Sequence, residues 1–164
     1  MLDFKSNEYY MTLALKQAAM AYHQGEVPIG AVIVHEEEVI GRAFNQVETL
    51  KDATAHAEVL AITQAAAKLE NWRLKDCTLF VTKEPCPMCA GAIVNSRITK
   101  VVFGLEDDKG GGCGGAFNIT NHDGLLHKVE VEAGCLSLES QSLIQSFFKE
   151  RREQQKAGKK KGDL

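Results

Sequence analysis

Two short motifs bring together side chains that could bind a metal ion. His56 and Glu58 stand two positions apart at the start of an Ala-rich run, and Cys86 and Cys89 lie in a Pro-Cys-Pro-Met-Cys motif that begins 29 residues after His56. Imidazole and thiolate groups are ligands that Zn²⁺ prefers, and two cysteines three positions apart at a helix start point to the same side. We therefore predict that His56, Cys86 and Cys89 bind one Zn²⁺ per chain.

Three protein ligands leave one position of a tetrahedral zinc ion open. This arrangement is typical of catalytic zinc sites, in which water takes the fourth position, whereas structural sites have four protein ligands. Glu58 is too close in the chain to His56 to be an easy ligand but could reach that water, so we predict that it is the general acid and base. The alternative is a structural zinc or RNA-binding module, with Cys113, Cys135 or His122 as a fourth ligand.

The segments around these motifs predict a fold of alternating helices and strands. Apolar residues at helical spacing, with Ser6 as a possible N-cap and Gly25 as a stop signal, indicate a first helix. Pro87 suits the first turn of a later helix, because its missing N–H costs nothing there. The alternation favours a three-layer α/β/α sandwich over a bundle or a barrel. Helices are predicted over residues 7–24, 55–69, 87–95 and 138–152, and strands over 29–34, 39–43, 78–82, 100–103 and 128–132.

Length and composition indicate an ordinary globular protein. The 164 residues suffice for one domain, which we place at residues 1–155, and 45% hydrophobic with 25% charged residues excludes wholesale disorder. No apolar run approaches the ~20 residues of a membrane span, and the chain does not start like an export signal, so we expect neither membrane insertion nor export. Five cysteines, an odd number, point to metal or thiol chemistry in a reducing cytoplasm.

Two further segments could contact a substrate. Residues 149–164 carry seven Lys or Arg against three Asp or Glu, a net charge of +4, whereas residues 1–148 have a net charge of −7. Such a basic cluster is a weak indication of nucleic-acid binding, and residues 156–164 also fit a solvated, mobile tail. The Gly-rich residues 110–115 lack the Gly-Lys-Ser/Thr of a phosphate-binding loop, so we expect a mobile active-site loop or a plain connector.

The combination of His-x-Glu and Pro-Cys-x-x-Cys is the signature of zinc-dependent nucleobase deaminases. Further motifs extend the similarity along the chain: Glu26-Val27-Pro28-Ile29-Gly30-Ala31-Val32, Thr54-Ala55-His56-Ala57-Glu58, Asn71-Trp72-Arg73-Leu74, Glu84-Pro85-Cys86-Pro87-Met88-Cys89-Ala90-Gly91-Ala92, Ser96-Arg97-Ile98, Val101-Val102-Phe103-Gly104, and Phe147-Phe148 before Arg151-Arg152. Over residues 7–155 the chain resembles the bacterial tRNA-specific adenosine deaminases of the TadA type, in the cytidine/deoxycytidylate deaminase superfamily.

The resemblance implies both a fold and an activity. The fold would be cytidine-deaminase-like, a three-layer α/β/α sandwich around a mixed five-stranded sheet, and the protein would form a homodimer. The activity would be zinc-dependent hydrolysis of the wobble adenosine of a tRNA, typically an arginine tRNA, to inosine. His56, Cys86 and Cys89 match the family's zinc ligands, and Glu58 matches its proton shuttle.

Three further positions match family residues that contact the RNA. Asn45 matches the asparagine that holds the base, and Asp107, rather than Asp108, matches an acidic loop residue beside the RNA backbone. Phe148 resembles a C-terminal aromatic residue that contacts the anticodon loop, whereas we expect Phe147 to pack in the core.

The chain departs from the family's usual pattern at two positions. Lys83 stands where the family usually has an apolar residue, and Leu126 stands where it often has asparagine. Neither departure removes a predicted zinc ligand. The enzymatic alternative is deamination of a free base or nucleotide, such as guanine or cytosine, in which case the basic tail would have no role.

Overall fold

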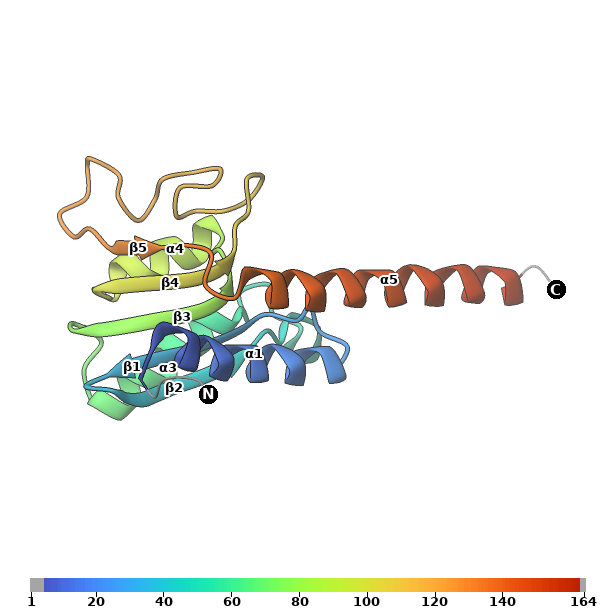
Figure 1. The fold of residues 1–164 in the computed structure, drawn as a ribbon, viewed down its shortest axis with the longest axis horizontal. Helices are drawn as coiled ribbons and strands as arrows, with labels where there is room; N and C mark the ends of the chain where they lie inside the picture. Colours follow the sequence, from blue (N-terminus) through green and yellow to red (C-terminus); the bar gives the residue numbers. More distant parts are fainter. Residues whose placement is uncertain (1–4, 163–164) are drawn as a thin grey trace.

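A five-stranded sheet with helices on both faces forms the body of the protein (Figure 1). The computed structural model describes residues 5–162, with side chains through residue 159. The strands are β1 (Gly30–His35), β2 (Glu38–Phe44), β3 (Cys77–Lys83), β4 (Lys100–Leu105) and β5 (Glu130–Glu132). The helices are α1 (Asn7–His23), α2 (Val47–Leu50), α3 (Ala57–Leu69), α4 (Pro87–Asn95) and α5 (Ser137–Gly162).

The strand order across the sheet is β2-β1-β3-β4-β5. β1 is antiparallel to β2 and β3, while β3, β4 and β5 are parallel to one another, so the sheet is mixed, as expected. β3 and β4 are in register from Thr78 opposite Lys100 to Lys83 opposite Leu105. The segments that follow these two strands therefore leave the sheet side by side, at the carboxyl ends of the strands. The segment after β3 leads into the Pro-Cys-Pro-Met-Cys motif.

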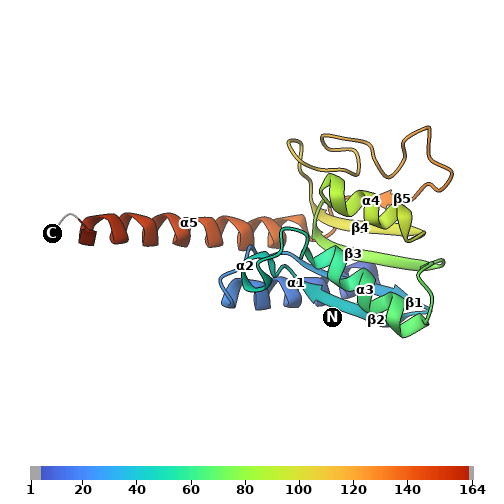
Figure 2. The same ribbon diagram turned by 180° about the vertical axis from the view of Figure 1, so that it is seen from behind.

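Alternate residues of each strand face two different hydrophobic clusters. Ala31 and Ile33 of β1 pack on the side of α3 and α4, whereas Val32 and Val34 pack on the side of α1. The same alternation continues in β3 and β4, as expected for strands that are buried on both faces. Figures 1 and 2 show α1 and the start of α5 on one face and α3 and α4 on the other. The predicted three-layer α/β/α sandwich is confirmed.

Most element boundaries agree with the sequence prediction to within two residues. The Ser6 hydroxyl caps α1 by accepting a hydrogen bond from the Tyr9 N–H at 3.1 Å, and Gly25 follows the helix with a left-handed φ of 75°. Pro87 occupies the first turn of α4, as predicted. The one-turn helix α2 was not predicted, because four residues are too few to show helical periodicity. The strand predicted over residues 128–132 begins only at Glu130.

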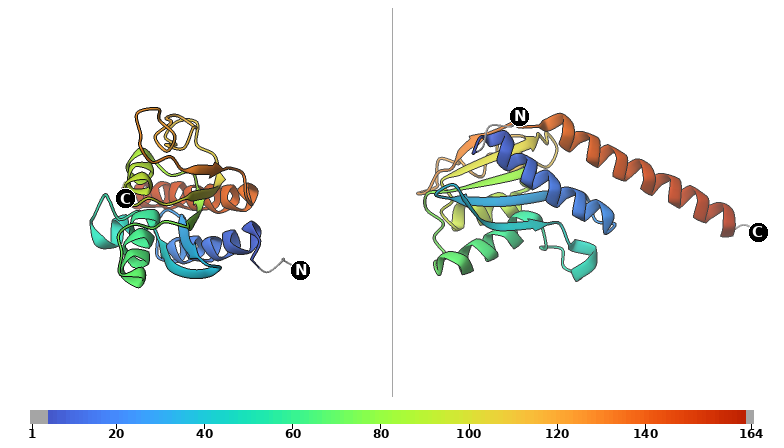
Figure 3. Two further views of the ribbon diagram at one scale, coloured as in Figure 1. Left: turned by 90° about the vertical axis from the view of Figure 1, so that its left-hand side faces the viewer. Right: turned by 60° about the horizontal axis from the view of Figure 1, so that its bottom comes forward.

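Helix α5 continues ten residues beyond the end of the segment predicted to be helical. Residues 153–157 contain no helix-breaking residue, and the helix passes through Gly158 and ends at Gly162. Residues 149–159 are all exposed, and this part of α5 extends beyond the body of the protein (Figure 3). Of the basic tail expected over 156–164, residues 163 and 164 lie outside the described chain. No helix within residues 5–162 is long and apolar enough to cross a membrane.

Replacing Gly30 with alanine should destabilise the protein. A Cβ atom there would lie 2.1 Å from the Ala14 carbonyl oxygen and 2.4 Å from the Ala18 nitrogen, both backbone atoms of α1. Because these atoms cannot move unless the helix shifts, we expect a loss of about 1–3 kcal/mol, or a melting temperature lower by about 2–4 °C per kcal/mol. Thermal unfolding followed by circular dichroism measures the change. In the control Gly158→Ala, the new methyl group meets nothing within 4 Å, so equal melting temperatures for the two variants would contradict this packing.

Candidate active site

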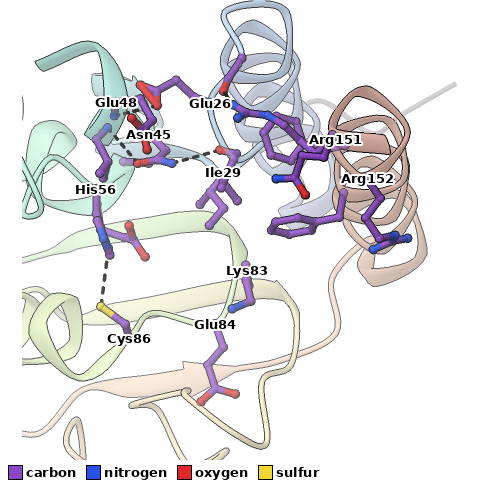
Figure 4. Close-up of a pocket in the computed structure, with 18 residues that line it drawn as sticks. Glu26, Ile29, Asn45, Glu48, His56, Lys83, Glu84, Cys86, Arg151 and Arg152 are labelled. Carbon is purple, nitrogen blue, oxygen red and sulfur yellow. Dashed lines mark hydrogen bonds between the residues drawn. The ribbon is translucent and has the colours of Figure 1, made fainter. Parts of the chain in front are cut away.

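The structure brings His56, Cys86 and Cys89 together. His56 is the N-cap residue of α3, Cys86 is the N-cap residue of α4, and Cys89 lies in the first turn of α4. The His56 Nδ1 atom is 3.6 Å from the Cys86 Sγ and 3.5 Å from the Cys89 Sγ, and the three potential ligand atoms lie within 4.8 Å of one another. The pairing of His56 with Cys86 is visible in Figure 4. The two motifs, far apart in the sequence, therefore form one cluster that could bind a metal ion.

The electrostatic environment favours a thiolate in this cluster. The Cys89 thiol and the His56 imidazole both hydrogen-bond to Cys86, and together they lower the pKa of Cys86 to about 4. The hydrogen bond between His56 and Cys86 raises the pKa of His56. The hydrogen bond between Cys89 and Cys86 raises the pKa of Cys89, and burial raises it further. The partial positive charge at the N-terminus of α4 also favours a negatively charged sulfur. A bound dication would deprotonate Cys89 as well, because a coordinating thiol gives up its proton.

The donor set fits Zn²⁺ with one position open. One imidazole nitrogen and two thiols are typical of zinc sites, and the three atoms are close enough to share an ion. Within residues 5–162, no fourth His, Cys, Asp or Glu joins this group. Three ligands with room for water correspond to a catalytic site rather than a structural one.

The three residues considered as a fourth ligand have other surroundings. Cys113 is buried, which raises its pKa to about 12, and its backbone pairs with Asn118 in an isolated bridge. Burial also raises the pKa of Cys135 to about 11, and this residue packs against the cluster on the α1 face. His122 is exposed, and its Nδ1 accepts a hydrogen bond from the Gly124 N–H. The structure therefore does not support the four-ligand alternative.

Glu58 lies beside the cluster in the first turn of α3. Its side chain is only 3% exposed, and this burial raises its pKa, while its interaction with the Cys89 thiol and the charge of His56 act in the opposite direction. A carboxyl group with a raised pKa holds a proton more readily than an exposed one and can return it, which is what a general acid and base requires. Glu58 also lines the pocket described next.

A pocket of about 530 Å³ opens above the metal-ligand cluster (Figure 4). This volume lies within the range of small-molecule sites, about 300–1,000 Å³. His56 and Cys86 form one side of the pocket, and residues of α5 form the opposite side, as Figure 4 shows for Arg151 and Arg152. The lining residues are Gly25, Glu26, Val27, Ile29, Asn45, Val47, Glu48, His56, Ala57, Glu58, Lys83, Glu84, Cys86, Phe147, Phe148, Arg151, Arg152 and Gln155.

Asn45 lies in the pocket wall, and backbone groups hold both ends of its amide. Its Nδ2 donates to the Val27 carbonyl at 3.3 Å, and its Oδ1 accepts from the Val47 N–H at 3.4 Å. The side chain, only 7% exposed, is therefore held in one orientation beside the cavity. Its expected role in holding the base stays a prediction.

The two neighbouring phenylalanines of α5 have different environments. Phe147 is buried, with its ring edge-on to Tyr22 and with the Arg151 guanidinium 5.0 Å from its centre, so its predicted place in the core is confirmed. Arg151 also donates to the Gly25 carbonyl and so joins α5 to the end of α1. Phe148 is 43% exposed and lines the pocket, so it is available for contact with a bound molecule.

Asp107 lies next to the pocket but is not among its lining residues. Its carboxylate accepts hydrogen bonds from the Lys109 and Gly110 N–H groups at 3.1 and 3.0 Å, and it pairs with the Lys83 ammonium at 2.5 Å. Lys83 is the main cause of the lowered pKa of Asp107. Lys83 itself does line the pocket, whereas Asp108 is exposed. The structure thus places a cation between the predicted RNA-contacting carboxylate and the cavity.

The buried carboxylate of Glu84 determines the path of the Gly-rich loop. It accepts hydrogen bonds from the backbone N–H groups of Asp107, Cys113 and Gly115 at 3.0–3.2 Å. A Cβ atom on Gly111 would lie 1.9 Å from a Glu84 oxygen, so the loop approaches this carboxylate too closely for a larger residue. The loop is therefore a connector that folds around one side chain.

Glu26 has a similar role at the other end of the pocket. Its carboxylate, 1% exposed, accepts from the N–H groups of Glu48 and Thr49 at the start of α2. Glu26 and Glu84 were not predicted as site residues, although each stands in one of the motifs that carry the resemblance. Their place in those motifs was the signal that could have identified them.

Replacing Cys86 with serine should remove the metal. A hydroxyl group is a poor zinc ligand, so we expect zinc affinity to fall at least about 100-fold. Replacing a residue that only hydrogen-bonds to a zinc ligand usually lowers the affinity by less than this. Metal analysis after dialysis against a weak chelator measures zinc per chain. The control Cys113→Ser should retain about one Zn²⁺ per chain. Loss of zinc in that control would identify Cys113 as a fourth ligand.

Comparisons with known proteins agree with this geometry. A family model described as MafB19-like deaminase matches residues 5–152. The tRNA-specific adenosine deaminase of Bacillus subtilis strain 168 is 48% identical over 94% of this chain and 96% of its own length. Among solved structures, one from a study of A-to-I editing by tRNA:A34 deaminases at the wobble position has a TM-score of 0.79 and 39% identity, over 82% of this chain and 98% of that one.

A guanine deaminase structure from Bacillus subtilis is also similar, but over a smaller part of the molecule. It is 40% identical with a TM-score of 0.59, and the match covers 62% of this chain and 65% of that one. The adenosine deaminase match extends over nearly the whole chain at higher identity. The chain therefore belongs to the family of tRNA-specific adenosine deaminases.

Proposed function

We propose that this protein is a hydrolase that converts the wobble adenosine of a tRNA anticodon to inosine and releases ammonia. The observation that carries the proposal is the cluster of His56, Cys86 and Cys89 beside the buried Glu58 in a single pocket. The family to which the chain belongs supports the choice of a tRNA adenosine as substrate. The ligand set supports Zn²⁺ as the metal.

The residues around the pocket divide the chemical work. When bound by His56, Cys86 and Cys89, Zn²⁺ supplies a water molecule that is easily deprotonated at neutral pH. As the oxygen of this water adds to C6 of the adenine ring, Glu58 accepts a proton from the water. Glu58 delivers that proton to the ring nitrogen. Glu58 then carries the proton of the new C6 hydroxyl group to the amino group, so that the C6–N bond breaks, ammonia leaves and the C6 carbonyl of inosine forms. Burial favours this role because the carboxyl group can hold a proton between steps.

The shape and charge of the pocket suit an unstacked nucleotide of an RNA loop. A base can enter the cavity only when it has left its stack, which costs least in a single-stranded loop. Phe148 lines the pocket from α5 and could stack on a base, and Arg152 on the same wall could meet the phosphate backbone. The exposed, basic half of α5 continues from this wall away from the body.

Several finer features of the proposal rest on the resemblance. These are the contact of Asn45 with the base, the contact of Asp107 with the RNA backbone, a homodimer, an arginine tRNA as substrate and a cytoplasmic location. Exposed apolar side chains such as Leu50, Trp72 and Met88 offer surface that a second subunit could cover. These features stay predictions.

Glutamine in place of Glu58 should abolish turnover without removing the metal. The amide has nearly the same size but cannot accept and return a proton, so we expect kcat to fall about 100-fold or more. Inosine formation on an anticodon stem-loop RNA measures turnover, and metal analysis of the same sample measures zinc. Loss of zinc from this variant would make Glu58 a ligand and would contradict its role as acid and base.

Four substrates at equal concentration should separate tRNA deamination from its rivals. They are a stem-loop with wobble adenosine, the same loop with cytidine, its all-DNA version and free adenosine. We expect the first to have the highest kcat/KM, because mismatched polar groups in a buried site cost about 1–3 kcal/mol each and because the 2′-OH distinguishes RNA from DNA. Ammonia release measures all four.

The similarity to a guanine deaminase supplies the second candidate function. Guanine therefore joins the panel as a fifth substrate. Turnover of guanine as fast as that of the stem-loop would overturn the tRNA proposal and support a free-base deaminase.

A further inference from the structure

Lys83 is a cation in the pocket that the chemistry described above does not use. It is the last residue of β3, and its side chain, 30% exposed, lines the cavity together with His56 and Cys86. Figure 4 shows it between the metal-ligand side of the pocket and the α5 side. A molecule bound in the pocket could therefore contact this ammonium group.

The ammonium group is held in position by a carboxylate that lies behind it. Asp107 does not line the pocket, and the N–H groups of Lys109 and Gly110 fix its other contacts. Within the described chain, the 2.5 Å contact with Asp107 is the single hydrogen bond of the Lys83 ammonium group. Because an ammonium group has three N–H donors, two can serve a ligand while the ion pair stays intact.

The charge of the surrounding wall gives this cation a specific use. Glu26, Glu48 and Glu58 line the pocket with acidic side chains, so a phosphate that enters it is favoured by a neighbouring cation. The Glu84 carboxylate points away from the cavity, toward the Gly-rich loop (Figure 4). Arg151 is engaged with a backbone carbonyl and the Phe147 ring. Lys83 and Arg152 remain as the other lysine and arginine of the lining that could meet a phosphate, and Figure 4 shows Arg152 on the α5 side.

We propose that Lys83 is a specificity-determining residue whose ammonium group binds a phosphate next to the target nucleotide while Asp107 holds it in place. This proposal rests on the proposed function. It explains why the enzyme would prefer a nucleotide within an RNA chain to a free base, because a free base has no phosphate for Lys83 to bind. Asp107 then positions Lys83 in addition to its own expected contact with the RNA, and Lys83 adds a second contact with the RNA backbone.

The test combines a change in the protein with a change in one phosphate. Stem-loop RNAs carry a single uncharged methylphosphonate linkage on either side of the wobble adenosine, each following a 2′-O-methyl nucleotide. Matched RNAs carry the same 2′-O-methyl group with an ordinary phosphate. kcat/KM is measured for the zinc-loaded wild type, Lys83→Met, Lys83→Arg and the control Lys75→Met. Lys75 is exposed and stands before the other end of β3.

We expect Lys83→Met to lower kcat/KM on the ordinary RNA about 10-fold, mainly through KM, as for loss of one hydrogen bond to a charged group. One of the two methylphosphonate linkages should lower kcat/KM of the wild type by about the same factor. The same linkage should not lower kcat/KM of Lys83→Met any further. Lys83→Arg keeps the positive charge and should retain most of the wild-type kcat/KM. The slope of log binding affinity against log salt should flatten by about 0.7 in Lys83→Met and stay unchanged in Lys75→Met.

Other results would overturn the proposal in recognisable ways. If each methylphosphonate lowers kcat/KM of Lys83→Met by the same factor as it lowers that of the wild type, Lys83 does not contact either phosphate. If Lys83→Met lowers the melting temperature and slows kcat with an unchanged salt slope, the ion pair with Asp107 is purely structural. If the wild type forms no inosine on the ordinary RNA, the proposed function itself fails.

Discussion

Two helix N-termini that meet at one edge of the sheet are the constraint on which the site depends. His56 and Cys86 can approach to 3.6 Å only because α3 and α4 both begin there, on the same face of the sheet. α3 packs on β1 and β2, while the turn before α4 follows β3, so the order β2-β1-β3-β4 fixes the distance between the ligands. The small residues Ala57, Ala61 and Ala90 allow this close packing.

Around this rigid centre, two buried carboxylates take the place of regular hydrogen-bonded structure. Glu84 satisfies three N–H groups of the loop after β4, and Glu26 satisfies two at the start of α2. Buried backbone groups must find partners, and loops do not supply them to one another as strands do. Each carboxylate therefore shapes a neighbouring loop, and around Glu84 the sequence supplies glycine, at Gly111 and Gly115, where the chain comes close.

The sequence predicted most of the framework because the framework follows local patterns. Helical spacing, the Ser6 cap and the apolar strands each act within a few residues, and the spacing of His56, Cys86 and Cys89 is itself a chemical pattern. The ion pair of Lys83 with Asp107 joins residues 24 positions apart, and no local pattern specifies it. The path of α5 beyond Arg152 was missed for another reason: the end of an exposed helix without a strong stop signal depends on small differences in propensity.

The pocket has one wall made of core elements and another made of an exposed helix. The first carries the reactive groups, and most changes there would cost folding energy because its residues pack against the sheet. The second is anchored mainly through Phe147, and beyond residue 148 its side chains are exposed, where substitutions usually alter stability by less than about 0.5 kcal/mol. Substitutions in α5 can therefore change the shape and charge of this wall of the pocket while the reactive centre on the other wall stays the same.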